Sequence, residues 1–356
     1  MIDVAGAYST VRVQEFYMSF NHVYGVDMGT GTVKIYDRNK DSITKEVNMI
    51  AVRNGDTVIA VGNDAYAMYE KTPENIEIIS PMSNGRINDV LMMEAVLHTM
   101  LGRTGGYAGY RPVLYFSVPV DMTEIERRAY STIARKGRFR RSQVYLVEKP
   151  IADALALGIP LHHTRGSMII NIGAQSTEVS FIADERVIIS RMIAIGGQAF
   201  TSAIVEGIRR KNSFIVSHHT AQRLKLTLTN LEKDINEGCK VNGIDLDSGL
   251  PRNGVVTSYN VTASVTAEMQ KIAAEIRRIM ERIPPQIRAG VLKEGIYITG
   301  GSTHIAGMVP FLEEALDCPV ILSKYYDLST VCGLKELITH PEMQHWAYLP
   351  GKKSYS

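Results

Sequence analysis

The sequence predicts an α/β protein built from two related lobes. An apolar strand, a Gly-containing turn and a second β-prone stretch occur twice, starting at Val23 and at Ser167. Asp27 and Asn171 occupy equivalent places in these two segments, a domain-sized distance apart. Strand and helix patterns also alternate along the rest of the chain. A repeat of this size indicates two lobes that each begin with the same strand–turn–strand unit.

The length and composition agree with two ordered lobes. A chain of 356 residues, with 45% hydrophobic and 21% charged residues, is long enough for a large core. The net charge of +2 gives no reason to expect nucleic-acid binding. No apolar run reaches the roughly 20 residues of a membrane helix, and no secretion signal precedes the lobes. We therefore expect a cytoplasmic protein.

The three cysteines, Cys239, Cys318 and Cys332, are far apart in the sequence. Their spacing matches neither a metal site nor a disulfide framework, as is usual in a reducing compartment. We expect them to be small buried hydrophobic residues.

The elements of the first lobe follow from local signals. Strands are expected at Val113–Pro119 and Gln143–Val147, and helices at Thr123–Lys136 and Ile151–Gly158. Thr123 followed by Glu126 is a capping-box pattern, which fixes the start of the first helix. Pro150 suits the first turn of the second helix, and the glycine suits its end.

The second lobe continues with longer helices. They are expected at Gly197–Arg210, Thr220–Leu228 and Ala263–Ile283, with a polar β-prone insert before about Ser258. Pro284-Pro285 ends the last of these helices. A strand at Gly295–Thr299 then runs into Gly300-Gly301-Ser302.

The turn after the first strand suits a polyphosphate. Its glycines allow backbone N–H groups to approach closely, and Thr30 and Thr32 add hydroxyl donors. Asp27 supplies a hard oxygen ligand for a hydrated Mg²⁺, and Lys34 could neutralise phosphate charge. A plain β-hairpin is the alternative reading of this turn taken alone.

The turn at Gly300 and Gly301 permits a flat ring, such as a base or a ribose, to pack against the backbone. A simple strand-to-helix turn is the alternative. Three glycine turns that each follow a strand, in two α/β lobes, together favour a nucleotide-binding cleft.

Seven stretches, in this order, resemble the superfamily of actin, sugar kinases and heat-shock-chaperone ATPases, and within it the MreB-type bacterial actins. They are Gly25–Thr30, Ile79–Ile87, Ser117–Val120, Glu126–Ala129, Thr220–Lys225, Asp245–Arg252 and Thr299–Ser302. The resemblance extends from about Tyr24 to Ile338.

The resemblance implies an actin-like ATPase fold with two ribonuclease-H-like lobes, each with a small inserted subdomain. Residues 1–22 would be an N-terminal extension, 23–158 lobe I with the insert 45–84, and 159–356 lobe II with the insert 195–255. ATP or ADP, with Mg²⁺, would occupy the central cleft.

The resemblance also implies roles for individual residues. The metal would be faced by Asp27 and Asn171, and the phosphates by Gly29, Thr30, Gly31, Thr32 and Lys34. The second phosphate hairpin would consist of Gly173, Ala174, Gln175 and Ser176. The ribose would lie near Gln222 and Lys225, and the adenosine near Gly300, Gly301 and Ser302.

Several positions depart from the family pattern. Where family members have a glutamate before the proline that positions the attacking water, this chain has Lys149. A protonated lysine has no lone pair with which to orient or deprotonate water. The neighbouring Glu148 points elsewhere, because a shift of one residue turns a side chain by about 100° on a helix or to the other face of a strand.

The second hairpin departs as well, since Asn171 replaces an aspartate, Ala174 and Gln175 replace glycines, and Gln222 replaces a glutamate near the ribose. We expect slow or absent hydrolysis and altered nucleotide binding. Alternatively, Lys149 contacts the γ-phosphate and favours a persistent ATP-bound state.

Three segments are candidates for a membrane or partner surface. The run 135–141 has five cations around Phe139, which suits anionic lipid or an acidic partner, although a solvated helix end is the commoner explanation. The loop Arg103–Tyr110 has Tyr107 and Tyr110 among glycines. The spacing of apolar residues in Met1–Phe20 favours an extra strand over a membrane helix.

The function expected from these features is that of a cytoskeletal protomer. It would assemble head to tail with itself and with other MreB-type proteins beneath the cytoplasmic membrane, and organise cell-wall synthesis and cell shape. The alternative is a catalytically silent paralogue that regulates or joins an active filament. A small-molecule kinase or a chaperone is less expected, because neither a catalytic carboxylate beside a substrate pocket nor room for a peptide-binding domain is evident.

Overall fold

The computed structural model describes residues 22–105, 111–164 and 166–351 of the chain. They form two units: one contains the chain up to Ala156 and from Thr330 on, and the other contains Leu157–Ser329. The N-terminal segment Met1–Phe20, Tyr107 and Tyr110 lie outside the described residues.

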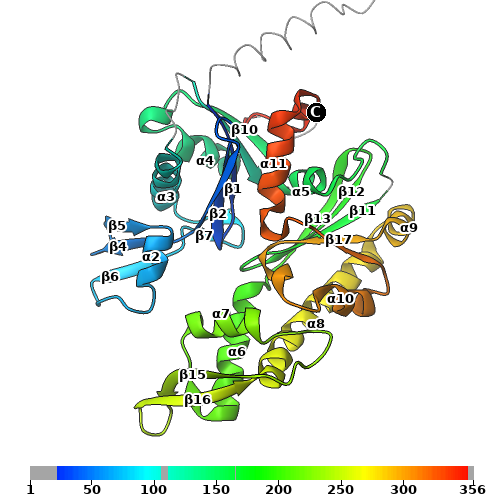
Figure 1. The fold of residues 1–356 in the computed structure, drawn as a ribbon. Helices are drawn as coiled ribbons and strands as arrows, with labels where there is room; N and C mark the ends of the chain where they lie inside the picture. Colours follow the sequence, from blue (N-terminus) through cyan, green and yellow to red (C-terminus); the bar gives the residue numbers. More distant parts are fainter. Residues whose placement is uncertain (1–21, 106–110, 165, 352–356) are drawn as a thin grey trace, which may run out of the picture. The chain divides into compact units, whose positions relative to one another are not determined.

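The main sheet of the first unit has five strands in the order β10-β9-β1-β2-β3. They are β1 (Val23–Met28), β2 (Thr32–Asp37), β3 (Ser42–Val47), β9 (Val113–Val118) and β10 (Gln143–Glu148). The first three pair antiparallel, while β9 and β10 run parallel to β1. Figure 1 shows β1 and β2 of this sheet in blue. The carboxyl ends of β1, β9 and β10 therefore meet at one edge of this sheet.

Four helices accompany this sheet: α3 (Val90–Arg103), α4 (Glu124–Ala134), α5 (Lys149–Leu157) and α11 (Ser329–Thr339). The predicted capping box is present, since Thr123 caps α4 and Glu126 bonds back to the Thr123 backbone. Helix α5 begins at Lys149, with Pro150 in its first turn, and Gly158 follows its last residue with a φ of 68°.

The end of the chain belongs to the first unit, whereas the sequence assigned it to lobe II. Helix α11 packs closely on α5, because a Cβ on Gly333 would lie 1.7 Å from the Ala152 carbonyl oxygen. Beyond it, after a 3-10 turn at Pro341–Trp346, Tyr348 and Leu146 exchange backbone hydrogen bonds of 2.8 and 2.9 Å. These contacts join the C-terminal segment to residues nearly two hundred positions earlier, which no local signal indicates.

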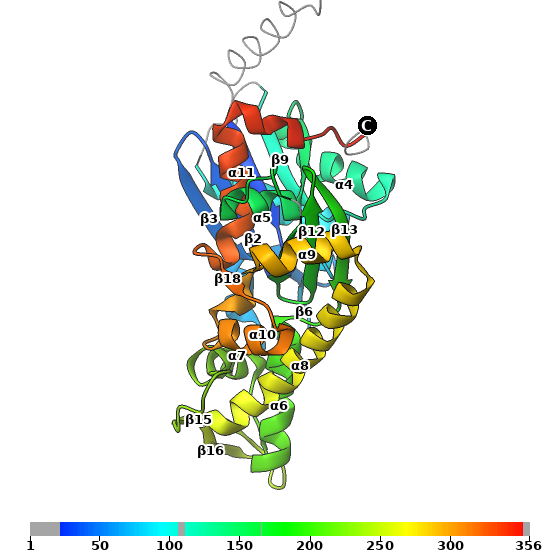
Figure 2. The ribbon, with the colours of Figure 1, turned by 90° about the vertical axis from the view of Figure 1, so that its right-hand side faces the viewer.

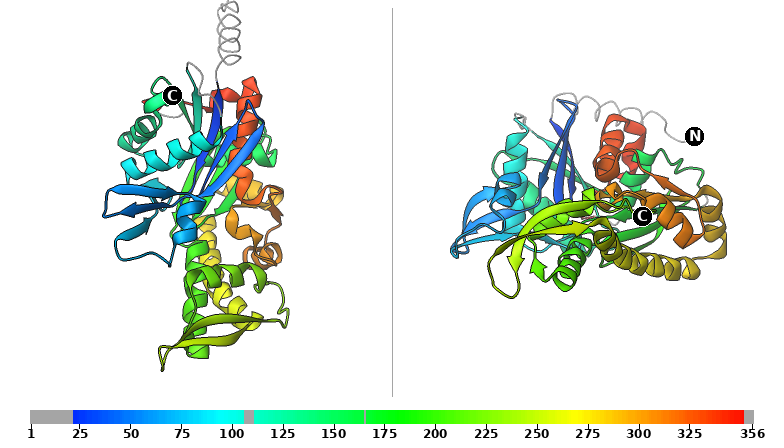
Figure 3. Two further views of the ribbon diagram at one scale, coloured as in Figure 1. Left: turned by 60° about the vertical axis from the view of Figure 1, so that its left-hand side comes forward. Right: turned by 60° about the horizontal axis from the view of Figure 1, so that its bottom comes forward.

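A smaller part of the first unit lies within the expected insert. Strands β4 (Ile50–Arg53), β5 (Thr57–Val61) and β6 (Ile76–Ile79) form a separate sheet beside α2 (Asn63–Met68), and β7 (Met82–Ser83) pairs with β8 (Arg86–Ile87). Figure 3 shows this sheet in blue.

The main sheet of the second unit repeats the strand order of the first. Its order is β13-β12-β11-β17-β18, with β11 (Ser167–Ile172), β12 (Thr177–Ala183), β13 (Arg186–Ile193), β17 (Ile296–Thr299) and β18 (Val320–Leu322). Again three antiparallel strands come first, and two strands parallel to the first of them follow. The predicted repeat of a strand–turn–strand unit in two related lobes therefore agrees with the topology.

The remaining elements of the second unit are helices and a small sheet. They are α6 (Gly197–Asn212), α7 (His218–Thr227), α8 (Ser258–Arg282), α9 (Pro285–Glu294), α10 (Met308–Leu316), β14 (Phe214–Ile215), β15 (Gly238–Asp245) and β16 (Pro251–Thr257). Figure 2 shows the long α8, which packs along α6, and Pro284 separates it from α9 as predicted.

Each unit has its own hydrophobic core. Phe116 and Tyr130 are buried in the first, and Phe181 and Phe200 in the second. Cys318 and Cys332 are buried, as expected, while Cys239 is partly exposed. In the part of the chain that the structure describes, no helix is both long enough and apolar enough to cross a membrane.

Candidate functional site: two glycine-rich loops

Strand register aligns the functional side chains of the first unit. Asp27 pairs laterally with Ser117, and Ser117 pairs with Val147 on its other side. Side chains of laterally paired residues point to the same face of a sheet. Asp27 and Ser117 therefore lie side by side at the carboxyl ends of parallel strands, where ligands bind in open α/β sheets.

Asp27 is buried, and each of its carboxylate oxygens accepts a hydrogen bond. Its Oδ2 accepts a hydrogen bond from Lys34 Nζ at 2.9 Å, and its Oδ1 accepts one from Ser117 Oγ at 2.8 Å. Burial opposes ionisation, but Lys34 and Lys149 together with these hydrogen bonds hold the pKa of Asp27 below its ordinary value. Asp27 is thus a carboxylate paired with Lys34 and stabilised in its charged form. Lys34, expected to face phosphate, is itself buried and paired with Asp27.

Hydrogen bonds from the backbone and from the Asn48 side chain fix the conformation of the first loop. Gly29 N donates to the Thr32 carbonyl at 3.0 Å, and a Cβ on Gly29 would lie 2.9 Å from that oxygen. Asn48 fixes the other side of the loop, since its Nδ2 donates to the Gly29 carbonyl and its N to that of Gly31. This arrangement leaves little freedom to the backbone of the loop.

Thr30 also joins the loop to the segment at Gly85. The Thr30 hydroxyl accepts a hydrogen bond of 3.0 Å from Gly85 N. Its proton can still be donated, so the predicted role of Thr30 as a donor is compatible with this contact.

Glu148 lies on the face of the sheet opposite to Asp27, and Lys149 begins the helix that follows. Glu148 is the last residue of β10, one position beyond Val147, and is buried with 3% of its surface exposed. Strand alternation therefore turns it away from the face that carries Asp27. Lys149, the next residue, is the first of helix α5 and half-buried, and its charge acts on Asp27. The prediction that Glu148 cannot replace the missing glutamate agrees with this register.

In the second unit, the turn at Gly173 contacts the start of helix α6. Gly173 N donates to the Ser176 carbonyl at 2.9 Å, and Gly197 N donates to the Gly173 carbonyl at 2.9 Å. Ser302 Oγ reaches the same carbonyl at 3.2 Å. The residues predicted at Gly173, Ser176 and Ser302 therefore lie together.

Gly196 and Gly197 also belong to this cluster, although neither was among the predicted site residues. A Cβ on Gly196 would lie 2.7 Å from Ser176 N and 2.8 Å from the Gly173 carbonyl oxygen. A signal was present, because these two glycines follow a strand and precede a helix, much as Gly300 and Gly301 follow one.

The turn at Gly300 packs against the second hairpin. Its φ is 99°, and a Cβ there would lie 2.5 Å from the Ile172 carbonyl oxygen and 2.8 Å from Asn171 Oδ1. Both the backbone conformation and the space require glycine. The predicted adenosine turn and the predicted metal-side position, Asn171, are therefore neighbours.

Lys225 is buried and bonded to helix α6. Its Nζ donates to the Gly197 carbonyl at 2.8 Å and to Thr201 Oγ1 at 3.1 Å. Burial lowers its pKa to about 8. Gln222, one turn earlier on α7, is exposed. Ala174 and Gln175 are partly exposed in their turn, and Gln198 N donates to the Ala174 carbonyl at 2.7 Å.

The expected magnesium site has one carboxylate, Asp27, among its predicted ligands. Mg²⁺ prefers carboxylate and water oxygens in near-octahedral geometry. Asp27 already accepts from Lys34 and Ser117, and the equivalent residue of the second unit, Asn171, is neutral. Within residues 22–105, 111–164 and 166–351, no three His, Cys, Asp or Glu side chains are grouped so as to hold a metal ion.

Several side chains of the basic run 135–141 contact other residues of the first unit, which the sequence alone does not indicate. Phe139 is fully buried, Arg138 lies over its ring and donates to the Leu101 carbonyl, and Lys136 pairs with Glu94. Arg135 donates to the Ser142 carbonyl at 3.3 Å. Arg135, Lys136 and Arg138 thus have partners within the first unit.

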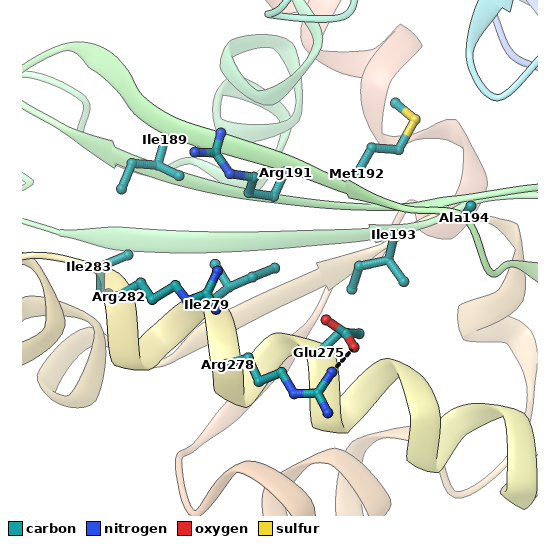
Figure 4. Close-up of a pocket in the computed structure, with 10 residues that line it drawn as sticks. All are labelled: Ile189, Arg191, Met192, Ile193, Ala194, Glu275, Arg278, Ile279, Arg282 and Ile283. Carbon is teal, nitrogen blue, oxygen red and sulfur yellow. Dashed lines mark hydrogen bonds and ion pairs between the residues drawn. The ribbon is translucent and has the colours of Figure 1, made fainter.

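A cavity of about 620 Å³ lies between strand β13 and helix α8 (Figure 4). Its lining includes Arg191, Arg278 and Arg282, and Arg278 pairs with Glu275. None of the loop residues described above lines it, so it is separate from the glycine-rich loops.

Comparisons with known proteins give a consistent picture. The sequence profile of the MreB/Mbl protein family matches residues 21–345. The cell shape-determining protein MreB of Escherichia coli (strain K12) is 29% identical over 320 residues, which cover 88% of this chain and 92% of that protein.

Two solved structures share the fold. The crystal structure of MreB5 of Spiroplasma citri bound to ADP has a TM-score of 0.83 and 24% identity, over 89% of this chain and 96% of that one. The MamK double helical filament has a TM-score of 0.73 and 16% identity, over 90% and 99%. The predicted actin-like α/β fold class is confirmed.

Proposed function

Because this chain belongs to the MreB/Mbl protein family, we propose that it is an actin-like cytoskeletal protein that binds ATP or ADP and assembles head to tail into filaments. The observation that carries nucleotide binding is that each unit has a glycine-containing strand–turn–strand loop at the carboxyl ends of its strands. Of the solved structures that share the fold, one is described as bound to ADP and another as a double helical filament.

We further propose that hydrolysis is slow or absent. Lys149 occupies the place of the glutamate that would position water, and Glu148, buried on the other face, does not replace it. An ammonium group cannot accept a proton from water at neutral pH. Without a general base, a bound ATP would persist.

The proposed partners are copies of this chain, other MreB-type proteins, the membrane surface and the machinery of cell-wall synthesis. Support comes from the relative named as cell shape-determining. Head-to-tail contacts that do not close give open filaments.

A second candidate function is that of a silent paralogue that joins or regulates an active MreB-type filament. The feature that favours it is Lys149 together with Asn171, two changes in charge at positions where the family carries acids. Such a protein would bind nucleotide and contact a filament without assembling alone.

One experiment tests these proposals together. Purified protein is incubated with ATP, with and without anionic vesicles, and pelleting and phosphate release are measured in the same tubes beside Lys149→Glu. Pelleting without phosphate release supports the filament proposal, and a gain of turnover in Lys149→Glu supports the lost base. Release by the wild type that the substitution leaves unchanged refutes the role of Lys149, and pelleting only with an active MreB-type protein supports the silent paralogue.

A further inference from the structure

The cavity between β13 and α8 is apolar at its base and cationic around its opening. Ile193 and Ile283 in its lining are buried. Arg191, Arg278 and Arg282 in the same lining are exposed, so the cavity opens to solvent where its cations lie. Figure 4 shows that these arginines come from both walls, one from the strand and two from the helix. A site of this composition suits a ligand that has both apolar and acidic groups.

The lining has more cations than anions. Its three arginines lie around one carboxylate, that of Glu275, which pairs with Arg278. Arg191 Nη1 donates to the carbonyl of the neighbouring Ser190 at 2.9 Å, and this contact keeps the guanidinium group beside its own strand. The excess of positive charge attracts acidic groups and disfavours a cationic ligand.

Arg191 occupies a place that the pattern of its strand gives to an apolar residue. It pairs laterally with Val179, and Ile189 pairs with Phe181. Val179 and Phe181 belong to the core, so Ile189, Arg191 and Ile193 share the core face of the sheet. A guanidinium group is costly to bury without a partner, and Arg191 stays exposed. No apolar side chain therefore closes the core face at this position.

Strand β13 is also the edge strand of its sheet. The order β13-β12-β11-β17-β18 places it at one end, and within the described residues no strand pairs with its other side. An edge strand presents unpaired N–H and C=O groups, to which an extended peptide can add as a further strand. Met192, on the face opposite Arg191, and Ile188, at the irregular position of the pairing, are exposed apolar side chains that an added strand would cover.

Arg278 and Arg282 are spaced to suit an extended chain. They lie four residues apart on α8, which is roughly 6 Å along the helix axis at about 1.5 Å per residue. Alternate side chains of an extended chain are roughly 7 Å apart and point to the same face. In Figure 4, β13 and α8 both run along the cavity. A strand added beside β13 can therefore present two acidic residues, separated by one position, to the two arginines.

We propose that this cavity binds an extended segment of a partner protein in which acidic and apolar residues alternate. The segment adds a strand to the free edge of β13, with its carboxylates on Arg278 and Arg282 and their methylene groups over the isoleucines. Its apolar side chains lie on the opposite face, beside Met192. The site lies within the second unit and contains none of the glycine turns, so the inference does not depend on nucleotide binding.

The test is fluorescence anisotropy with the full chain, at low ionic strength and without nucleotide. The probe is a labelled synthetic octapeptide in which glutamate and valine alternate. The control peptide has the same composition in two blocks, glutamates first and valines second. We expect saturable binding of the alternating peptide, at least about tenfold tighter than that of the block peptide, because only alternation places all carboxylates on one face of a strand.

Variants test the arginines. Arg278→Gln with Arg282→Gln should weaken binding of the alternating peptide by about tenfold or more, because two hydrogen-bonded charge contacts are lost. Arg209→Gln with Arg210→Gln is the matched control, since these exposed arginines at the end of α6 lie outside the lining and the net charge changes equally. The control should bind within about twofold of the wild type. Circular dichroism checks that each variant folds.

Hydrogen exchange followed by mass spectrometry measures the strand pairing itself. On addition of the alternating peptide, amide exchange in Arg186–Ile193 should slow, because an added strand protects the outward N–H groups of the edge. This measurement uses the wild type alone, so it decides the result even if a variant does not fold.

Four results contradict the inference. If the alternating peptide does not bind, the cavity is not a site for such a segment. If both peptides bind equally, or if the alternating peptide binds without protection of β13, charge attracts the peptide and no strand is added. If Arg278→Gln with Arg282→Gln binds as the wild type does, these arginines do not recognise the acidic residues. The proposed nucleotide binding and filament assembly stand unchanged by any of these results.

Discussion

Replacement of Lys225 by methionine should change how stability depends on pH. Lys225 is 8% exposed, and its Nζ donates to the Gly197 carbonyl and to Thr201 Oγ1. Burial lowers its pKa from 10.5 to about 8. The folded protein therefore releases this proton at a lower pH than the unfolded chain does.

The direction in which stability changes with pH follows from the number of protons bound in the folded and unfolded states. Below pH 8 both states carry the proton, and the cost of the buried charge is fully present. Between pH 8 and 10.5 the unfolded chain binds more protons, so stability rises with pH. One pH unit corresponds to about 1.4 kcal/mol, so the gain up to roughly pH 9.5 is about 2 kcal/mol.

The assay is urea unfolding followed by circular dichroism, at about pH 7.5 and about pH 9.5. We expect the free energy of unfolding of the wild type to rise by about 2 kcal/mol relative to Lys225→Met between these two conditions. The comparison of the two proteins cancels the titration of other groups. Lys71→Met, at an exposed position, should show no such difference. A wild-type and Lys225→Met difference that is the same at both pH values would refute the reasoning.

Two further substitutions test the loops. Asp27→Asn removes the negative charge that pairs with the buried Lys34, and should lower the free energy of unfolding by about 3 kcal/mol, measured in urea. A loss below about 1 kcal/mol would show that the pair is not the buried contact described here. Gly300→Ala adds a Cβ 2.5 Å from a backbone oxygen at a φ of 99°. It should cost about 2 kcal/mol more than Gly55→Ala, which has a φ of 84° but open space around it, and should also weaken nucleotide binding. Equal costs for the two glycines, by thermal unfolding, would contradict the close packing.

Local signals predicted most of the elements. The capping box at Thr123 and Glu126 and the glycine at position 158 mark helix boundaries that depend on adjacent residues. Both strand–turn–strand segments were predicted because an apolar stretch ends at a glycine-containing turn and a second β-prone stretch follows. The resemblance to MreB-type proteins is confirmed by the family profile. The roles of individual site residues stay predictions.

Contacts between distant segments were not predictable in the same way. The hydrogen bond of Ser117 to Asp27 and the packing of α11 on α5 have no local pattern. They arise when strands pair and helices pack, which joins residues that are far apart in the chain. For the same reason, three cations of the basic run have partners within the first unit that composition alone did not reveal.

The sequence by itself determined the chemistry that is available: a lysine at position 149, an asparagine at 171, and two glycine-rich turns after strands. Those identities fix charge and hydrogen-bonding capacity whatever the fold. Only the tertiary structure decided which groups meet. Asp27 and Ser117 are 90 residues apart and become neighbours because β1 and β9 pair in parallel, and the same register turns Glu148 away from them. That Asp27 accepts hydrogen bonds from both Lys34 and Ser117 depends on that register.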